Sequence, residues 1–212
     1  VPAIKKAKEM GYEVISVDYD PYAVGFELAD VKLVVSTLDQ EEVLKQARIY
    51  EPDVVITSTS DGPVRTAAYV NEKLGKKPDL SYEDSLCATI KSYMRERLKE
   101  CNVPIPQFFV VNDAFEFTQA VRQINGDMIV KPADNAGSRG VVLLKKDAAT
   151  GQTEPTDALE VYEYSKSNSR NGVVMVEEFM EGEEVSVESM TVNGETTIIT
   201  ITDKMTTPPP YF

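Results

Sequence analysis

The sequence predicts an α/β protein of two lobes, with an α+β arrangement in the second lobe. Over residues 1–75, helical patterns alternate with short β-branched runs, which is typical of a parallel sheet with helices on its faces. From Ser81 onward the pattern changes to helices, separate strands and a terminal β-hairpin. A length of 212 residues suits one large domain or two small ones. We expect domains over residues 1–85 and 86–212.

The first lobe begins with a helix in which Ile4, Ala7 and Met10 recur at helical spacing and Gly11 provides the C-terminal cap. We expect a strand to precede this helix in the complete fold. Three strands and two helices follow it. They are predicted as strands over residues 14–17, 31–36 and 53–60, a helix capped by Thr37 or Asp39 with Val43, Leu44, Ala47 and Tyr50 on one face, and a helix over residues 63–74 that Gly75 ends.

Asp18 ends the first predicted strand and has two interpretations. Dinucleotide-binding folds place an acid at such a position to bind the ribose hydroxyls. No glycine fingerprint precedes Asp18 in this sequence, although that function requires one. We therefore favour the alternative, in which Asp18 caps the turn in the segment DYDP.

The second lobe begins with a helix predicted over residues 82–101, where apolar side chains form a stripe and the segment NVPIPQ ends the helix. The stripe consists of Ile90, Met94, Leu98 and Cys101. The Asn193-Gly194 pair is the strongest hairpin signal in the chain. The other predicted elements are strands over residues 108–111, 128–130 and 172–180, a helix over residues 117–124 that ends at Gly126, a loop and helix over residues 151–169, and a hairpin over residues 185–202.

Composition and charge exclude several functions. The 22 Lys and Arg residues are scattered among 35 Asp and Glu residues, and the formal charge of −13 argues against a nucleic-acid partner. No apolar stretch approaches the roughly 18–20 residues of a membrane span, so we expect a soluble protein. Cys87 and Cys101 fit free thiols in a reducing cytoplasm. The sequence has no histidine, which excludes Ser-His or Cys-His catalysis and imidazole metal ligation for this chain.

The segment MIVKPADNAGSRGVVLL, residues 128–144, places a lysine at the end of a buried strand. An unpaired ammonium there is costly, so Lys131 needs an anionic partner or a route to water. The following loop offers two glycines, a hydroxyl, a guanidinium and several amide donors, carried by Gly137, Ser138, Arg139 and Gly140. It is not a Walker A loop, because no Gly-Lys-Ser/Thr ends it. The segment alone fits a phosphate-binding loop and a plain glycine-containing hairpin equally well.

A second candidate segment is VMVEEFMEGEEVSVE, residues 174–188. An extended strand of this kind can read the edge of a purine with its backbone, while Phe179 and Met180 add apolar surface and a later carboxylate can accept both ribose hydroxyls. The alternative is a strand with solvated glutamates. Lys91, taken alone, is an ordinary solvent-facing lysine of a surface helix.

Together and in order, these segments resemble the ATP-grasp superfamily, in particular the branch related to the large subunit of carbamoyl phosphate synthetase and to L-amino-acid ligases. Residues 7–30 are similar to the nucleotide-fold domain that precedes the grasp in that branch, residues 91–107 to its helix and linker, residues 129–141 to its lysine and flexible loop, and residues 176–188 to its adenine-reading hinge. The resemblance covers essentially the whole chain.

The resemblance implies a truncated, Rossmann-like pre-ATP-grasp domain followed by an incomplete ATP-grasp domain. Within the latter it implies a lid subdomain over about residues 104–172 and the start of a second subdomain over residues 173–212. Lys91 and Lys131 resemble the lysines that hold the α- and β-phosphates, although Ile90 stands where the family commonly has an acid. The other implied ATP contacts are Gly137, Ser138, Arg139 and Gly140 in the phosphate loop, Glu177, Glu178, Phe179 and Met180 in the hinge, and Glu184 at the ribose.

The family's reaction, as the resemblance implies it, joins a carboxylate to an amine at the expense of ATP. The carboxylate attacks the γ-phosphate to give an acyl phosphate and ADP, and the amine then displaces the phosphate. Two Mg²⁺ ions are implied, with ligands expected downstream of Phe212, and no catalytic residue is assigned within the chain. Expected partners are small carboxylate and amine substrates, and a homodimer is left open. Alternatives are a non-catalytic nucleotide-binding module and phosphorylation of bicarbonate or carbamate, as in carbamoyl phosphate synthesis.

Overall fold

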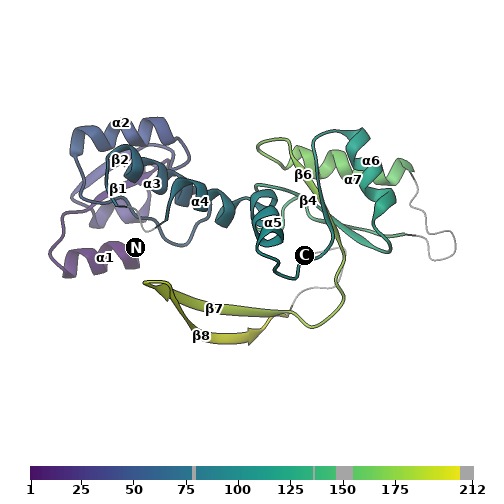
Figure 1. Ribbon diagram of the computed structural model, residues 1–212. Coiled ribbons are helices and arrows are strands. Elements are labelled where there is room, and N and C mark those ends of the chain that lie inside the picture. The colour runs from purple at the N-terminus through teal and green to yellow at the C-terminus, as the bar shows by residue number, and fades with distance from the viewer. Residues whose placement is uncertain (78–79, 136, 147–154, 206–212) are drawn as a thin grey trace. The chain divides into compact units, whose positions relative to one another are not determined.

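The computed structural model describes residues 1–77, 80–135, 137–146 and 155–205 (Figure 1). The chain divides into two compact units, Val1–Met94 and Arg95–Phe212. Both units mix helices and strands, as the sequence predicts.

The first unit contains a parallel pair of strands, in which Ile15 of β1 lies opposite Val31 of β2. The sequence correctly predicts this alternation of strands and helices. The core lies between α2 and α3, where Val43, Leu44, Ala47 and Val70 are buried. The elements are α1 (Pro2–Glu9), β1 (Ile15–Asp18), the 3₁₀ helix η1 (Val24–Leu28), β2 (Val31–Val34), α2 (Gln40–Tyr50), α3 (Gly62–Lys73) and α4 (Tyr82–Thr89).

Two carboxylates in the first unit act as local caps. An Asp18 carboxylate oxygen accepts the N–H of Asp20 at 3.0 Å, which is the turn interpretation that we favour from the sequence. Asp39 accepts the N–H of Glu42 at 3.1 Å and thereby begins α2.

The strand predicted over residues 53–60 is wrong, because this segment is irregular in the structure. A side chain takes the place that a neighbouring strand would have. The buried amide of Asn71, in α3, accepts the N–H of Val55 at 2.9 Å and donates to the Val55 carbonyl at 2.7 Å. The β-branched composition of the segment favours a strand and could not reveal this hydrogen-bond partner.

The single helix predicted over residues 82–101 is also wrong, because it is interrupted at Ile90. Ile90 has an extended backbone with φ −118° and ψ 118°, so α4 ends at Thr89 and α5 (Lys91–Glu100) begins directly after it. Ile90 still closes both helices, since its N–H donates to Leu86 and its carbonyl accepts from Met94, each at 2.9 Å. Its side chain is buried.

The second unit is built on a four-stranded antiparallel sheet with the order β3-β6-β4-β5. Helices α6 and α7 bury one face of this sheet, and the rings of Phe117 and Tyr162 stack there at 5.0 Å. Met128, Val130 and Val176 of the strands belong to the same core. The elements are β3 (Phe108–Val111), α6 (Ala114–Gln123), β4 (Met128–Pro132), β5 (Val142–Leu144), α7 (Pro155–Ser167) and β6 (Val174–Glu178).

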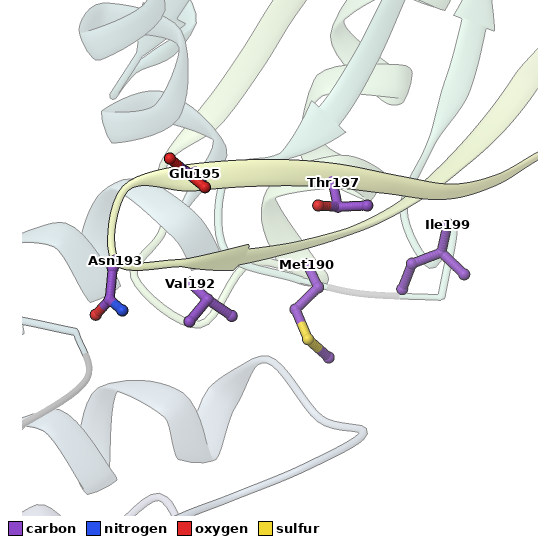
Figure 2. Close-up of a pocket in the computed structure, with 6 residues that line it drawn as sticks. All are labelled: Met190, Val192, Asn193, Glu195, Thr197 and Ile199. Atoms are coloured by element: carbon purple, nitrogen blue, oxygen red, sulfur yellow. The ribbon is translucent and has the colours of Figure 1, made fainter.

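The terminal hairpin forms as predicted from β7 (Val185–Val192) and β8 (Glu195–Asp203). Asn193 and Gly194 both have positive φ, 51° and 83°, as a tight hairpin turn requires. Figure 2 shows Met190 and Val192 pointing to the same side of the hairpin, over a shallow hollow. The residues that line this hollow are Met190, Val192, Asn193, Glu195, Thr197 and Ile199, and the sequence assigns none of them to a site.

Candidate nucleotide-binding site

The face of the sheet opposite to α6 and α7 carries charged side chains at its centre. Strand pairing places Ile129 opposite Glu177, so Lys131, two residues further along β4, lies on the same face as Glu177. The Lys131 ammonium contacts a Glu177 carboxylate oxygen, Oε2, at 2.6 Å. Both side chains are largely buried, with exposed fractions of 15% and 5%. The structure therefore brings together two residues that the sequence places in one site, and it gives the lysine the anionic partner that its position requires.

Arg95, on α5, completes this cluster and is missed by the sequence analysis. Its Nε donates to Glu177 Oε1 at 3.0 Å and its Nη2 donates to Oε2 at 3.1 Å. Arg95 lies four residues after Lys91 in one helix, and this pair of basic residues at helical spacing is the signal that could have drawn attention to it.

The carboxyl of Glu177 is held ionised by its two partners. Burial alone raises the pKa of this carboxyl, but the hydrogen bonds and positive charges of Arg95 and Lys131 outweigh burial, so its pKa lies below the ordinary value. One carboxylate and two cations leave a local surplus of one positive charge. In a chain with a formal charge of −13, such a surplus favours an anionic ligand at this position.

The loop between β4 and β5 has one open part and one anchored end. Gly137, Ser138 and Arg139 are exposed, and the first two have positive φ values of 70° and 56°. Gly140 is buried with φ 79°, and its carbonyl accepts the Ser165 hydroxyl of α7 at 2.7 Å. The sequence assigns all four residues to one flexible phosphate loop, whereas the structure gives Gly140 a packing role at the base of that loop.

Packing explains why Gly140 has to be glycine. A Cβ atom at this position would lie 2.7 Å from Asn168 Cβ and 2.8 Å from Pro132 Cγ. At Gly137, by contrast, a Cβ would meet no described atom within 4 Å. The two glycines share a left-handed backbone, and only the second is also required by a close approach.

The end of β6 extends the sheet into the predicted hinge. The N–H of Glu178 donates to the Gln107 carbonyl at 2.9 Å, and the N–H of Phe179 donates to the Asp127 carbonyl at 3.0 Å. These bonds use neither the Glu178 carbonyl nor the Met180 N–H, and both residues belong to the hinge that the resemblance assigns to ATP. Met180 is well exposed, so apolar surface is available beside these groups.

The last two predicted site residues lie outside this cluster. Glu184 stands at the base of the hairpin, where its carboxylate contacts the Lys204 ammonium at 2.6 Å and both side chains are half exposed. Lys91 is the first residue of α5 and belongs to the first unit. Their assigned roles at the ribose and at the α-phosphate stay predictions.

The described residues contain neither a metal-binding cluster nor a membrane-spanning helix. No three His, Cys, Asp or Glu side chains in the described ranges come together in a way that could hold a metal ion. Every helix in that part of the chain is too short or too polar to cross a membrane.

Comparison with known proteins identifies the class of protein. The family model described as the phosphoribosylglycinamide synthetase ATP-grasp (A) domain matches residues 89–204, more than half of the chain. The chain therefore belongs to the ATP-grasp family, which uses ATP with Mg²⁺, and the resemblance noted from the sequence is confirmed.

Individual relatives support the same assignment. The carbamoyl phosphate synthase large chain of Pseudothermotoga lettingae is 28% identical over 152 residues, which are 69% of this chain and 14% of that protein. Among solved structures, N5-carboxyaminoimidazole synthetase from Staphylococcus aureus, complexed with ADP, has a TM-score of 0.73 at 16% identity and covers 96% of this chain and 51% of its own. The biotin carboxylase domain of the Hydrogenobacter thermophilus 2-oxoglutarate carboxylase, with MgADP, ADP and bicarbonate, has a TM-score of 0.75 at 14% identity and covers 95% of this chain and 47% of its own.

The two structural likenesses show a shared ATP-grasp fold of mixed α and β structure. The chain spans about half the length of these solved structures and a much smaller part of the synthase large chain.

The ion cluster predicts an acid-sensitive second unit. Since the folded-state pKa of Glu177 lies below its ordinary value of 4.5, the cluster stabilises the fold at neutral pH, and this stabilisation is lost as the pH falls below 4.5 through the folded-state value. Glu177→Gln is expected to lower the free energy of unfolding by about 3 kcal/mol at neutral pH and by less in acid, measured by urea unfolding. Glu184→Gln, which breaks a half-exposed pair, should cost less than about 1 kcal/mol. An equal pH dependence in the wild type and the Glu177 variant would contradict the assignment.

The two loop glycines are expected to respond differently to alanine. Gly137→Ala should cost about 1–2 kcal/mol, because a Cβ strains a left-handed backbone. Gly140→Ala should destabilise the fold by about 1–3 kcal/mol more than Gly137→Ala does, because the new methyl group also collides with Pro132 and Asn168. Thermal unfolding of both variants measures the difference, and equal stability of the two would refute the packing role of Gly140.

Proposed function

We propose that this chain carries the ATP-binding portion of an ATP-dependent carboxylate–amine ligase that works through an acyl phosphate. Membership of the ATP-grasp family supports this proposal at the level of the class. The observation that carries it is the Lys131 ammonium, held by Glu177 at the end of β4, directly before a loop of left-handed glycines.

In this proposal, Lys131 of the sheet and the residues of the loop both contact the polyphosphate of ATP. An ammonium has three N–H donors, and the bond to Glu177 uses one of them, so Lys131 can donate to phosphate oxygens. The exposed residues Gly137, Ser138 and Arg139 add amide, hydroxyl and guanidinium donors for the β- and γ-phosphates. Lys91 is assigned to the α-phosphate.

The adenosine part is assigned to the hinge. The Glu178 carbonyl and the Met180 N–H provide an acceptor and a donor for the purine edge, Phe179 and Met180 provide apolar contact, and Glu184 accepts the ribose hydroxyls. Binding of ribose requires that Glu184 exchange its exposed ion pair with Lys204, at a small cost because such pairs contribute little.

The domain organisation that we propose keeps the predicted boundary between residues 85 and 86, which precedes the division of the structure into compact units between Met94 and Arg95. Residues 1–85 form the Rossmann-like domain that precedes the grasp, and residues 86–212 form the N-terminal part of the ATP-grasp domain, with the lid over about residues 104–172. Magnesium supplies charge neutralisation at the transferring phosphate in such a reaction. The described residues hold no cluster that fits a metal ion, and the proposal assigns no metal ligand among them.

Removing the Lys131 side chain is expected to weaken Mg-ATP binding about 10- to 100-fold, because a charge-assisted contact to phosphate is lost. Lys91→Ala should weaken binding by less. Isothermal titration calorimetry measures both affinities. Lys8→Ala is a matched control, since Lys8 contacts Asp30 at 2.6 Å in an exposed pair within the first unit, and it should bind as the wild type does. Unchanged ATP affinity in the Lys131 variant would remove the central assignment.

The ligase reaction itself is expected to appear as substrate-dependent release of ADP. The complete protein should be screened with ATP, Mg²⁺ and pairs of small carboxylates and amines. ADP release that requires both a carboxylate and an amine supports the ligase, and release with bicarbonate supports carbamoyl-phosphate-type chemistry. Tight ATP binding without ADP release for any pair of carboxylate and amine would favour a non-catalytic nucleotide-binding module over a ligase.

A further inference from the structure

Glu177 divides its two carboxylate oxygens unequally between its partners. Oε1 accepts from Arg95 Nε, whereas Oε2 accepts from both Arg95 Nη2 and Lys131 Nζ. Oε2 is therefore a shared atom, and any rotation of the carboxylate changes the contact with Lys131. We infer that Arg95 is a positioning residue for ATP binding, which acts through Glu177 to hold the Lys131 ammonium ready for a phosphate. This inference rests on the proposed function.

The geometry of the arginine contact explains how it sets that orientation. A guanidinium that binds both oxygens of a carboxylate through two N–H groups fixes the plane of the carboxylate, which a single ammonium cannot do. Without Arg95, the Glu177 side chain could turn and offer both oxygens to Lys131. The ammonium would then be bound more fully to Glu177 and less available to a ligand.

Charge supports the same role. With Arg95 present, the negative charge of Glu177 is shared between two cations, and the cluster keeps one positive charge in surplus. Without Arg95, Glu177 and Lys131 neutralise each other at 2.6 Å, and the attraction for a phosphate falls. The low exposure of Glu177 makes this difference larger than it would be at the surface, because water screens the charges less.

Arg95 is itself held in place by its helix. One turn further along α5, the Lys99 ammonium lies 5.7 Å from the centre of the Phe108 ring on β3. Phe108 is paired with Glu177 in the sheet, so the two contacts of α5 reach neighbouring positions on the same face. The exposed fraction of the Arg95 side chain is 22%, which is low for an arginine in the middle of a helix.

A double-mutant cycle tests whether Arg95 acts through Lys131. Four proteins are compared by titration with Mg-ATP: the wild type, Arg95→Ala, Lys131→Ala and the double variant. Arg95→Ala is expected to weaken ATP binding about tenfold. Arg95→Ala should cost clearly less affinity in the Lys131→Ala background than in the wild type, because only the effect of its charge, and not the positioning of Lys131, is then lost. Losses that multiply in the double variant would overturn the inference.

Three further measurements separate positioning from a general loss of structure. Arg95→Lys keeps the positive charge but loses the contact of two N–H groups with the two Glu177 oxygens, so it should lose most of the ATP affinity that Arg95→Ala loses. Full ATP affinity in Arg95→Lys would overturn the role of this paired contact. Adenosine, which has no phosphate, should bind equally well to the wild type and both Arg95 variants, and a parallel loss of adenosine binding would overturn the inference.

Arg97→Ala, which breaks an exposed pair with Glu100 on the same helix, is the matched control and should bind ATP normally.

Failure of this inference can be told apart from failure of the proposed function. Wild-type protein that does not bind ATP contradicts the proposed function and the inference with it. Wild-type protein that binds ATP and loses affinity with Lys131→Ala, but not with Arg95→Ala, contradicts the role of Arg95 alone.

Discussion

The contact between Glu177 and its two cations is the interaction on which the second unit and its site depend. It joins α5 to β6 across 82 residues of sequence, and β4 to β6 across 46 residues. A buried carboxylate without partners is heavily penalised, and removal of one partner leaves the other charge uncompensated. The same three side chains therefore stabilise the arrangement of α5 on the sheet and determine the charge that the sheet presents to a ligand.

The sheet of the second unit separates these tasks between its two faces. Met128, Val130 and Val176 pack under α6 and α7 and supply apolar burial, which is the main source of stability. The intervening positions on the opposite face hold Lys131 and Glu177. Strand alternation makes this division possible, because adjacent residues of β4 can serve packing and ligand binding without competing.

The sequence predicted those features that depend on local patterns. The hairpin at Asn193 and Gly194 follows from backbone conformations that few other residues adopt, and the cap at Asp39 follows from short-range hydrogen bonding. The irregular segment at residues 53–60 and the break at Ile90 were missed, because the first depends on a side chain in the next helix, Asn71, and the second accompanies the burial of Ile90, which a local pattern does not show. Arg95 was missed for a similar reason: an arginine in a polar helix looks solvated until its partner, far along the chain, is known.

In the proposed ATP site, short-range contacts have to supply the affinity, because the charge of the whole chain opposes it. At a formal charge of −13, the protein repels a polyphosphate at a distance, but this repulsion is screened beyond about 8 Å at physiological salt. Within that range the surplus charge of the Arg95–Glu177–Lys131 cluster and the amide groups of the loop dominate. Amide donors add attraction without further cations that would repel Lys131. Under the proposed function, pairing one fixed lysine with a loop of left-handed backbone is thus a way to bind a highly charged anion in an acidic protein.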